Sequence, residues 1–110
     1  MIEGASNRVP VAPHWDIFRE AERDHPDLIA ALAEEIRNYA AGLSEVNSTT
    51  AGAAILPKWA RRDEWSRLFG SHSSQLFGMV VWVTLFDDAQ TWRTATEEVG
   101  GRQVRIYRRA

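Results

Sequence analysis

The sequence predicts an α+β domain in which N-terminal helices precede a C-terminal antiparallel sheet. Apolar residues recur at helical spacing between residues 28 and 43, whereas the residues on both sides of Gly100-Gly101 are typical of two strands of a β-hairpin. The chain has 110 residues, of which 45% are hydrophobic and 25% charged. That length suffices for one hydrophobic core and is too short for two ordinary domains. We therefore expect an extended arm over residues 1–14 and a single domain over residues 15–110.

Two helices are predicted after the arm. The arm itself is inferred from Pro10 and Pro13, which each remove a backbone donor and bias the preceding residue away from helix. Residues 15–24 should form a short helix with Trp15, Phe18 and Ala21 on one face. Proline is favoured in a first helical turn, so a longer helix should begin at Pro26 and end near Gly42. Its apolar stripe consists of Leu28, Leu32, Ile36, Tyr39 and Leu43.

The middle of the chain carries weaker signals. Residues 44–57 mix small polar residues with a short apolar end, which predicts a loop with a helical turn near residues 53–56. A helix should follow within residues 58–70, with Asp63 as its N-cap and Gly70 as its end. Its apolar face would consist of Trp65, Leu68 and Phe69.

The segment QLFGMVVWVTLF, residues 75–86, has two interpretations. Its β-branched and aromatic residues favour a strand buried on both faces, which would pair with residues 91–99 across a turn at residues 87–90. The sheet would then be a three-stranded meander, with Trp82 beside Ala95. A helix over the same residues would be apolar on every side and would produce a winged-helix-like layout instead.

The hairpin around Gly100-Gly101 has a definite predicted register. Two glycines suit a type I′ turn, whose central residues both need positive φ. One face should be the core side, with Val99, Ala95, Val104 and Ile106. The other face would mix apolar and basic residues: Trp92, Tyr107, Arg105 and Arg109. Such a patch should be covered by a helix, the N-terminal arm, a second copy or a partner. Self-association into a homodimer is one expectation from it.

Motifs for catalysis, cofactors or metals are not visible. The chain has no cysteine, its three histidines lie far apart, and no glycine-rich phosphate loop occurs. The paired carboxylates are neighbours in sequence, which diverge on a helix or a strand. We therefore predict a non-enzymatic protein without a cofactor or a bound metal. No export signal and no membrane-spanning run is seen, so a cytoplasmic protein with no membrane partner is expected.

The charge distribution favours a nucleic-acid partner for the C-terminal half. The formal net charge is −2, but residues 1–57 hold four Lys/Arg and nine Asp/Glu, whereas residues 58–110 hold nine and six. Trp92 should make a cation–π contact with Arg109, and together with Tyr107 and Arg105 it could stack on bases or anchor a protein interface. Phosphate-neutralising roles are predicted for Lys58, Arg61, Arg62, Arg93, Arg102 and Arg105.

The order of elements over residues 58–110 resembles in outline a winged helix-turn-helix domain, where one helix enters the major groove and a hairpin lies along the backbone. In the corresponding stretch, SHSSQLFGMVVWVTLF, only the first residues are polar. The leading hypothesis is a small DNA-binding regulatory protein that uses its basic C-terminal half. The alternative is a protein-binding module (an inhibitor, adaptor or antitoxin-like partner) that uses the Trp92/Tyr107 face or the acidic N-terminal helices.

Overall fold

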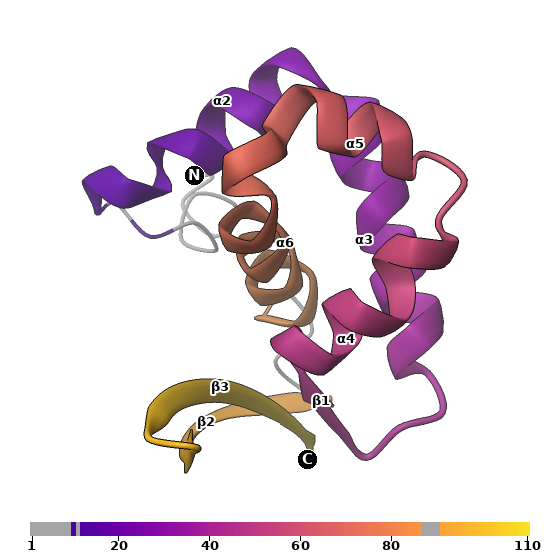
Figure 1. Ribbon diagram of the computed structural model, residues 1–110. Coiled ribbons are helices and arrows are strands. Elements are labelled where there is room, and N and C mark those ends of the chain that lie inside the picture. The colour runs from indigo at the N-terminus through magenta and orange to yellow at the C-terminus, as the bar shows by residue number, and fades with distance from the viewer. Residues whose placement is uncertain (1–9, 11, 87–90) are drawn as a thin grey trace, which may run out of the picture.

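The predicted α+β class is confirmed, with helices in the first part of the chain and an antiparallel hairpin at its end (Figure 1). The structure is a computed structural model that describes residues 10, 12–86 and 91–110. The α-helices are α2 (Asp16–Asp24), α3 (Pro26–Ala40), α4 (Ser48–Ile55), α5 (Arg62–Phe69) and α6 (Ser73–Phe86). The strands are β1 (Glu45–Asn47), β2 (Trp92–Val99) and β3 (Arg102–Arg109). Short 3₁₀ turns are η1 (Pro13–Trp15), η2 (Leu56–Lys58) and η3 (Gly70–His72).

Helices α2 and α3 form where the apolar spacing predicted them. Trp15, Phe18 and Ala21 are buried beside α2, and His25 separates that helix from α3. Helix α3 begins at Pro26 and buries Leu28, Leu32 and Ile36 in the core. It ends at Ala40, two residues before the predicted Gly42. Most of the arm predicted for residues 1–14 lies outside the described residues.

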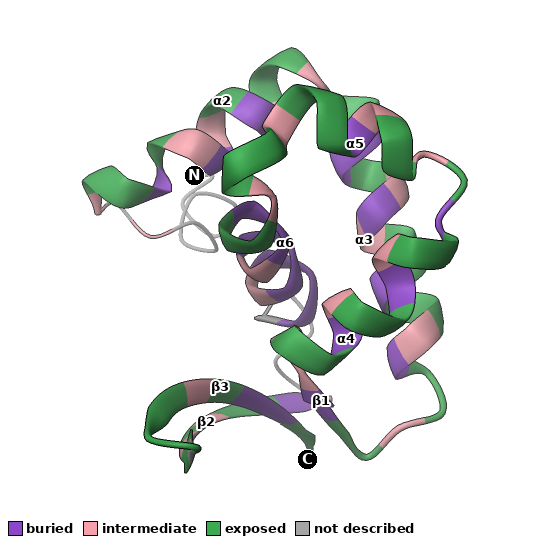
Figure 2. Cartoon of the chain, in the orientation of Figure 1, coloured by how far each residue is buried: buried purple, intermediate pink, exposed green. Residues whose placement is uncertain are grey.

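Helix α6 contradicts the predicted strand. Residues 79–86 are helical, and the strand prediction for them is wrong. Between Leu76 and Leu85 every residue is buried except Gly78 and Trp82, which are half-buried. Helices α2, α3, α4 and α5 and strand β2 all contact α6, which therefore lies at the centre of the fold (Figure 2). Because neighbours cover it on all these sides, a helix without a polar face is stable there despite its β-branched residues.

The third strand comes from a segment that was predicted as a loop. Residues 44–57 contain β1 and α4, so the helical turn expected at residues 53–56 is part of a longer helix. Asn47 begins it, because its side-chain oxygen accepts hydrogen bonds from the backbone N–H groups of Thr49 (2.8 Å) and Thr50 (3.2 Å). β1 pairs antiparallel with β3, and the sheet order is β1-β3-β2 rather than a meander.

Helix α5 is confirmed in position and corrected in detail. It ends at Gly70 as predicted, with a positive φ of 23° at that glycine. Asp63 lies in the first turn and is not the N-cap, a position that Arg61 occupies. Trp65 is fully buried, whereas Leu68 is 41% exposed, so Leu68 is not part of the core-facing side.

The predicted hairpin register is confirmed at every pair, from Trp92 opposite Arg109 to Val99 opposite Arg102. Gly100 and Gly101 have φ values of 58° and 81°, as a two-residue turn of this kind requires. The predicted core face is wrong. Trp92 and Tyr107 belong to the hydrophobic core, whereas Ala95 and Val104 on the opposite face are only half-buried. Ile106 on that face is buried but lies outside the core cluster.

The reason for this reversal is the position of α6. As a helix it lies on the Trp92 side of the hairpin, so a helix covers the mixed face from which self-association was predicted. The turn predicted at residues 87–90 lies outside the described residues. No helix in the described ranges is long and apolar enough to cross a membrane.

Candidate nucleic-acid interface

Three of the predicted site residues have structural roles. Trp92 is 6% exposed and Tyr107 is 1% exposed, so neither side chain offers a surface to a partner. The Arg109 guanidinium lies 4.5 Å from the Trp92 ring centroid, which confirms the predicted cation–π contact. The same guanidinium donates hydrogen bonds to the backbone carbonyls of Ala40 and Leu43, both at 2.8 Å. Arg109 therefore ties the end of α3 to the sheet.

Because Tyr107 is buried, the protein should lose stability at alkaline pH. Burial raises the pKa of the Tyr107 phenol above its ordinary value of 10.0, and the charge of Arg105 opposes that shift only in part. The phenol therefore ionises first in the unfolded chain, and stability is lost as pH rises above that ordinary value. Between about pH 8 and about pH 11, the unfolding free energy of Tyr107→Phe should fall by about 1.4 kcal/mol less than that of the unchanged protein. Urea denaturation at the two pH values measures both decreases. Equal decreases in both proteins would contradict this assignment.

The cations around η2 and α5 lie away from the hairpin. Arg61 pairs with Glu64 at 2.9 Å and with Asp27 at 3.4 Å. Arg62 contacts Asp63 at 3.4 Å, and Lys58 is exposed in η2. Figure 1 places the segment joining α4 to α5 far from the turn between β2 and β3. These cations and the hairpin arginines therefore do not form one continuous surface.

The hairpin arginines have different environments. Arg93 is exposed on β2 opposite Arg108, on the face turned away from α6. Arg108 is ion-paired with Glu45 and Glu97. Arg102 is exposed at the start of β3 and Arg105 is exposed further along it. Arg102 shares the face of Arg93 and Arg105 lies on the face toward α6, but both line a hollow beside the start of α4. These two arginines are therefore the candidates for contact with a polyanion.

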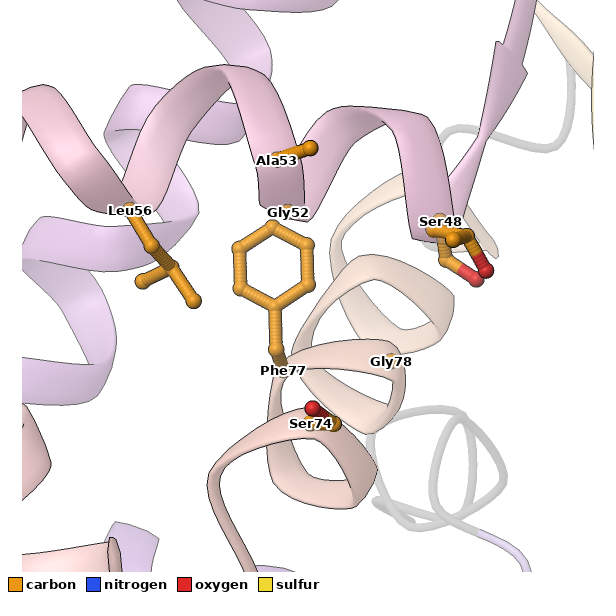
Figure 3. Close-up of a pocket in the computed structure, with 8 residues that line it drawn as sticks. Ser48, Gly52, Ala53, Leu56, Ser74, Phe77 and Gly78 are labelled. Atoms are coloured by element: carbon orange, nitrogen blue, oxygen red, sulfur yellow. The ribbon is translucent and has the colours of Figure 1, made fainter.

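Three adjoining hollows lie between α4, α6 and β3. The first, of about 280 Å³, separates α4 from α6, and Figure 3 shows the Phe77 ring reaching from α6 toward Gly52 within it. The second, of about 360 Å³, lies among η1, α6 and β3, and the third, of about 340 Å³, lies between the start of α4 and β3. Ser48 lines all three, and Arg105 lines the second and third. We call these hollows together the basic cleft.

The cleft is distinguished by its charge. The described residues that line it include Arg102 and Arg105 but no aspartate or glutamate. Exposed polar side chains also border it: Thr49, Thr50, Ser74, Gln75 and Gln103. Carboxylates are instead concentrated on α2 and α3. The described residues that line the cleft therefore carry a net positive charge, although the chain as a whole is acidic.

Trp82 is the site residue that the sequence interpretation missed. It was predicted to face the core beside Ala95, but it is half-buried on α6 and lines the second hollow. The Arg105 guanidinium lies 4.4 Å from its ring centroid. Gln75, Gly78 and Trp82 follow one another at spacings of three and four, so a helical interpretation of the segment would have placed them on one face.

The start of α6 is held in place by α5. The indole N–H of Trp65 donates a hydrogen bond of 2.8 Å to the hydroxyl oxygen of Ser73, the first residue of α6. This bond positions the exposed Ser74 and Gln75 that follow. Ser74 and Gln75 are the exposed polar residues in the described part of α6. After them, the residues up to Leu85 that are not buried are Gly78 and Trp82.

Comparisons with known proteins identify no family for this chain. No family model, no curated protein and no solved structure matches this chain. Among the described residues, no three His, Asp or Glu side chains are grouped so that they could hold a metal ion.

Proposed function

We propose that this protein is a small, non-enzymatic DNA-binding regulatory protein that holds DNA against the basic cleft. The observation that carries the proposal is the lining of the cleft, where Arg102 and Arg105 occur and the described residues include no carboxylate. A phosphate backbone is attracted to such a positive hollow, and release of its counterions supplies much of the binding free energy.

The arrangement of elements supports the same proposal. A helix, a short strand, three further helices and a hairpin follow in the order α3, β1, α4, α5, α6, β2 and β3, with sheet order β1-β3-β2. This outline is similar to a winged helix-turn-helix layout, with the β2–β3 hairpin in the place of the wing. The departure is α6, which presents little more than Ser74 and Gln75 to a ligand. We therefore expect contacts to phosphates to dominate over contacts to base edges.

The protein-binding alternative has less support from the geometry. Its first version used Trp92 and Tyr107, which lie in the core. Its second version used the acidic helices, where Asp16 pairs with Arg19 at 2.8 Å and Glu34 pairs with Arg37 at 3.3 Å. These pairs partly neutralise the surface that would attract a basic partner.

The proposal is tested by fluorescence anisotropy with a labelled DNA of about 20 nucleotides, as a duplex and as a single strand, across a salt series. Binding should weaken steeply as salt rises. The double variant Arg102→Ala/Arg105→Ala should bind at least about tenfold more weakly at low salt. Its plot of log affinity against log salt should be shallower by about two, because each arginine that neutralises a phosphate contributes about one to the slope.

The matched control is Lys58→Ala/Arg62→Ala, which removes the same charge from exposed positions outside the cleft. At about 0.15 M salt it should bind within about twofold of the unchanged protein, because charges more than about 8 Å from the DNA are largely screened there. The proposal fails if neither form of DNA binds at low salt, or if the two double variants weaken binding equally.

A further inference from the structure

We infer that the basic cleft receives an unpaired base, so that its preferred ligand is single-stranded DNA, with Arg105 stacked on Trp82 as the platform for that base. This inference rests on the proposed function and names the form of DNA that the same cleft takes. Four features of the cleft support it, each described below.

The first feature is a planar platform. The Arg105 guanidinium lies 4.4 Å from the centroid of the Trp82 ring, which is stacking distance for a cation–π pair. Arg105 is exposed, so its side chain is accessible to a ligand. Trp82 is held edge to face against the buried Trp15, with ring centroids 6.5 Å apart. Unpaired bases stack on arginine planes and aromatic rings of this kind.

The second feature is the hollow beside the platform. It has a volume of about 360 Å³, at the low end of the range for ligand pockets. Gln75 and Ser48 line it together with Arg105. A glutamine amide offers both a donor and an acceptor, which matches the edge of a base whose partner has been removed. The hollow therefore combines a stacking surface with groups that can pair with one base.

The third feature is that α6 forms a wall of the cleft. Reading the edges of paired bases requires a helix or ribbon that projects into a groove of the duplex. Here Gly78 has no side chain, and from Leu76 to Leu85 the remaining residues apart from Trp82 are buried. A duplex would keep its bases away from Gln75, whereas a single strand can turn a base into the hollow.

The fourth feature is a division of roles between the two arginines. Arg102 lines the hollow between α4 and β3, with no ion pair or hydrogen bond to a described residue. It is therefore placed to neutralise a phosphate, for which a lysine would serve nearly as well. Arg105 is the one that overlies an aromatic ring in the cleft, and its contribution depends on a planar guanidinium.

The test compares Arg105→Lys with the matched control Arg102→Lys, since both keep the charge of the cleft. Anisotropy is measured with a mixed single strand of about 12 nucleotides and with the corresponding duplex. The unchanged protein should prefer the single strand by about tenfold, the scale of one stacked base. Arg105→Lys should lose about tenfold on the single strand and little on the duplex, at an unchanged salt slope. Arg102→Lys should change both by less than about twofold.

The possible outcomes separate this inference from the proposed function. Preferential binding of the duplex, or equal effects of the two lysine variants on the single strand, overturns the single-strand inference and leaves DNA binding in place. Absence of binding to both forms overturns the two proposals together. Circular dichroism of each variant shows that it is folded, which both conservative substitutions at exposed positions should preserve.

Discussion

Val81→Asp should prevent the chain from folding at neutral pH. Val81 is 0% exposed on α6, which other elements cover on several sides. An ionised carboxylate without a partner at that position costs several kcal/mol, and the burial of the valine side chain is lost as well. A single domain is stable by only about 5–15 kcal/mol, so the combined loss removes most or all of its stability. Far-UV circular dichroism and urea denaturation measure the effect.

The control for this variant is Ser74→Asp, which places the same charge in the same helix. Ser74 is exposed in the first turn of α6, where a negative charge interacts favourably with the helix dipole. Its stability should stay within about 0.5 kcal/mol of the unchanged protein. A Val81→Asp protein that unfolds in urea with nearly unchanged stability would show that α6 is not the central helix of the core.

Trp65→Ala should lower the unfolding free energy by about 3–5 kcal/mol. The Trp65 side chain is 0% exposed, and its ring contacts Phe69 and Trp59 at centroid distances of 4.8 Å and 6.0 Å. Its indole N–H also donates the hydrogen bond to Ser73 that connects α5 to α6. Removal of the side chain leaves a large cavity and abolishes that connection. Chemical denaturation with tryptophan fluorescence or circular dichroism measures the loss.

A double-mutant cycle separates the hydrogen bond from the packing. Trp65→Phe keeps an aromatic ring but removes the donor, and Ser73→Ala removes the acceptor. The coupling free energy between the two substitutions should be about 0.5–1.5 kcal/mol. A coupling free energy near zero would mean that the start of α6 is positioned by packing alone.

Local signals in the sequence predicted several parts of this fold correctly. Helix α3 follows from the proline that begins it, Pro26, and from the apolar stripe that starts at Leu28, and both features depend on neighbouring residues only. The cap at Asn47 was missed although asparagine is a favoured N-cap, because the following residues, rich in Ser, Thr and Ala, have no apolar periodicity. The β1 strand is too short to show an alternating pattern.

The candidate site was predicted in part. Arg102 and Arg105 were among the predicted residues and line the cleft, and Tyr107 lines it as a core residue, whereas Trp92 belongs to the core alone. The prediction that Trp82 faces the core rests on a strand over residues 79–86, and these residues are helical. A strand alternates its side chains between two faces, while a helix brings Gln75, Gly78 and Trp82 together. The error in one element therefore placed Trp82 beside Ala95 instead of beside Arg105, on the opposite face of the hairpin.

What the sequence determined by itself is the hairpin register, the start of α3 at Pro26 and the end of α5 at Gly70. Two glycines in a turn admit one pairing of the strands, and proline and glycine begin or end helices through their own backbone geometry. Only the tertiary structure decided that α6 is a helix and that Trp92 and Tyr107 face it. An apolar segment without periodicity has no face of its own, so its conformation and the face of the hairpin that it buries depend on what packs around it.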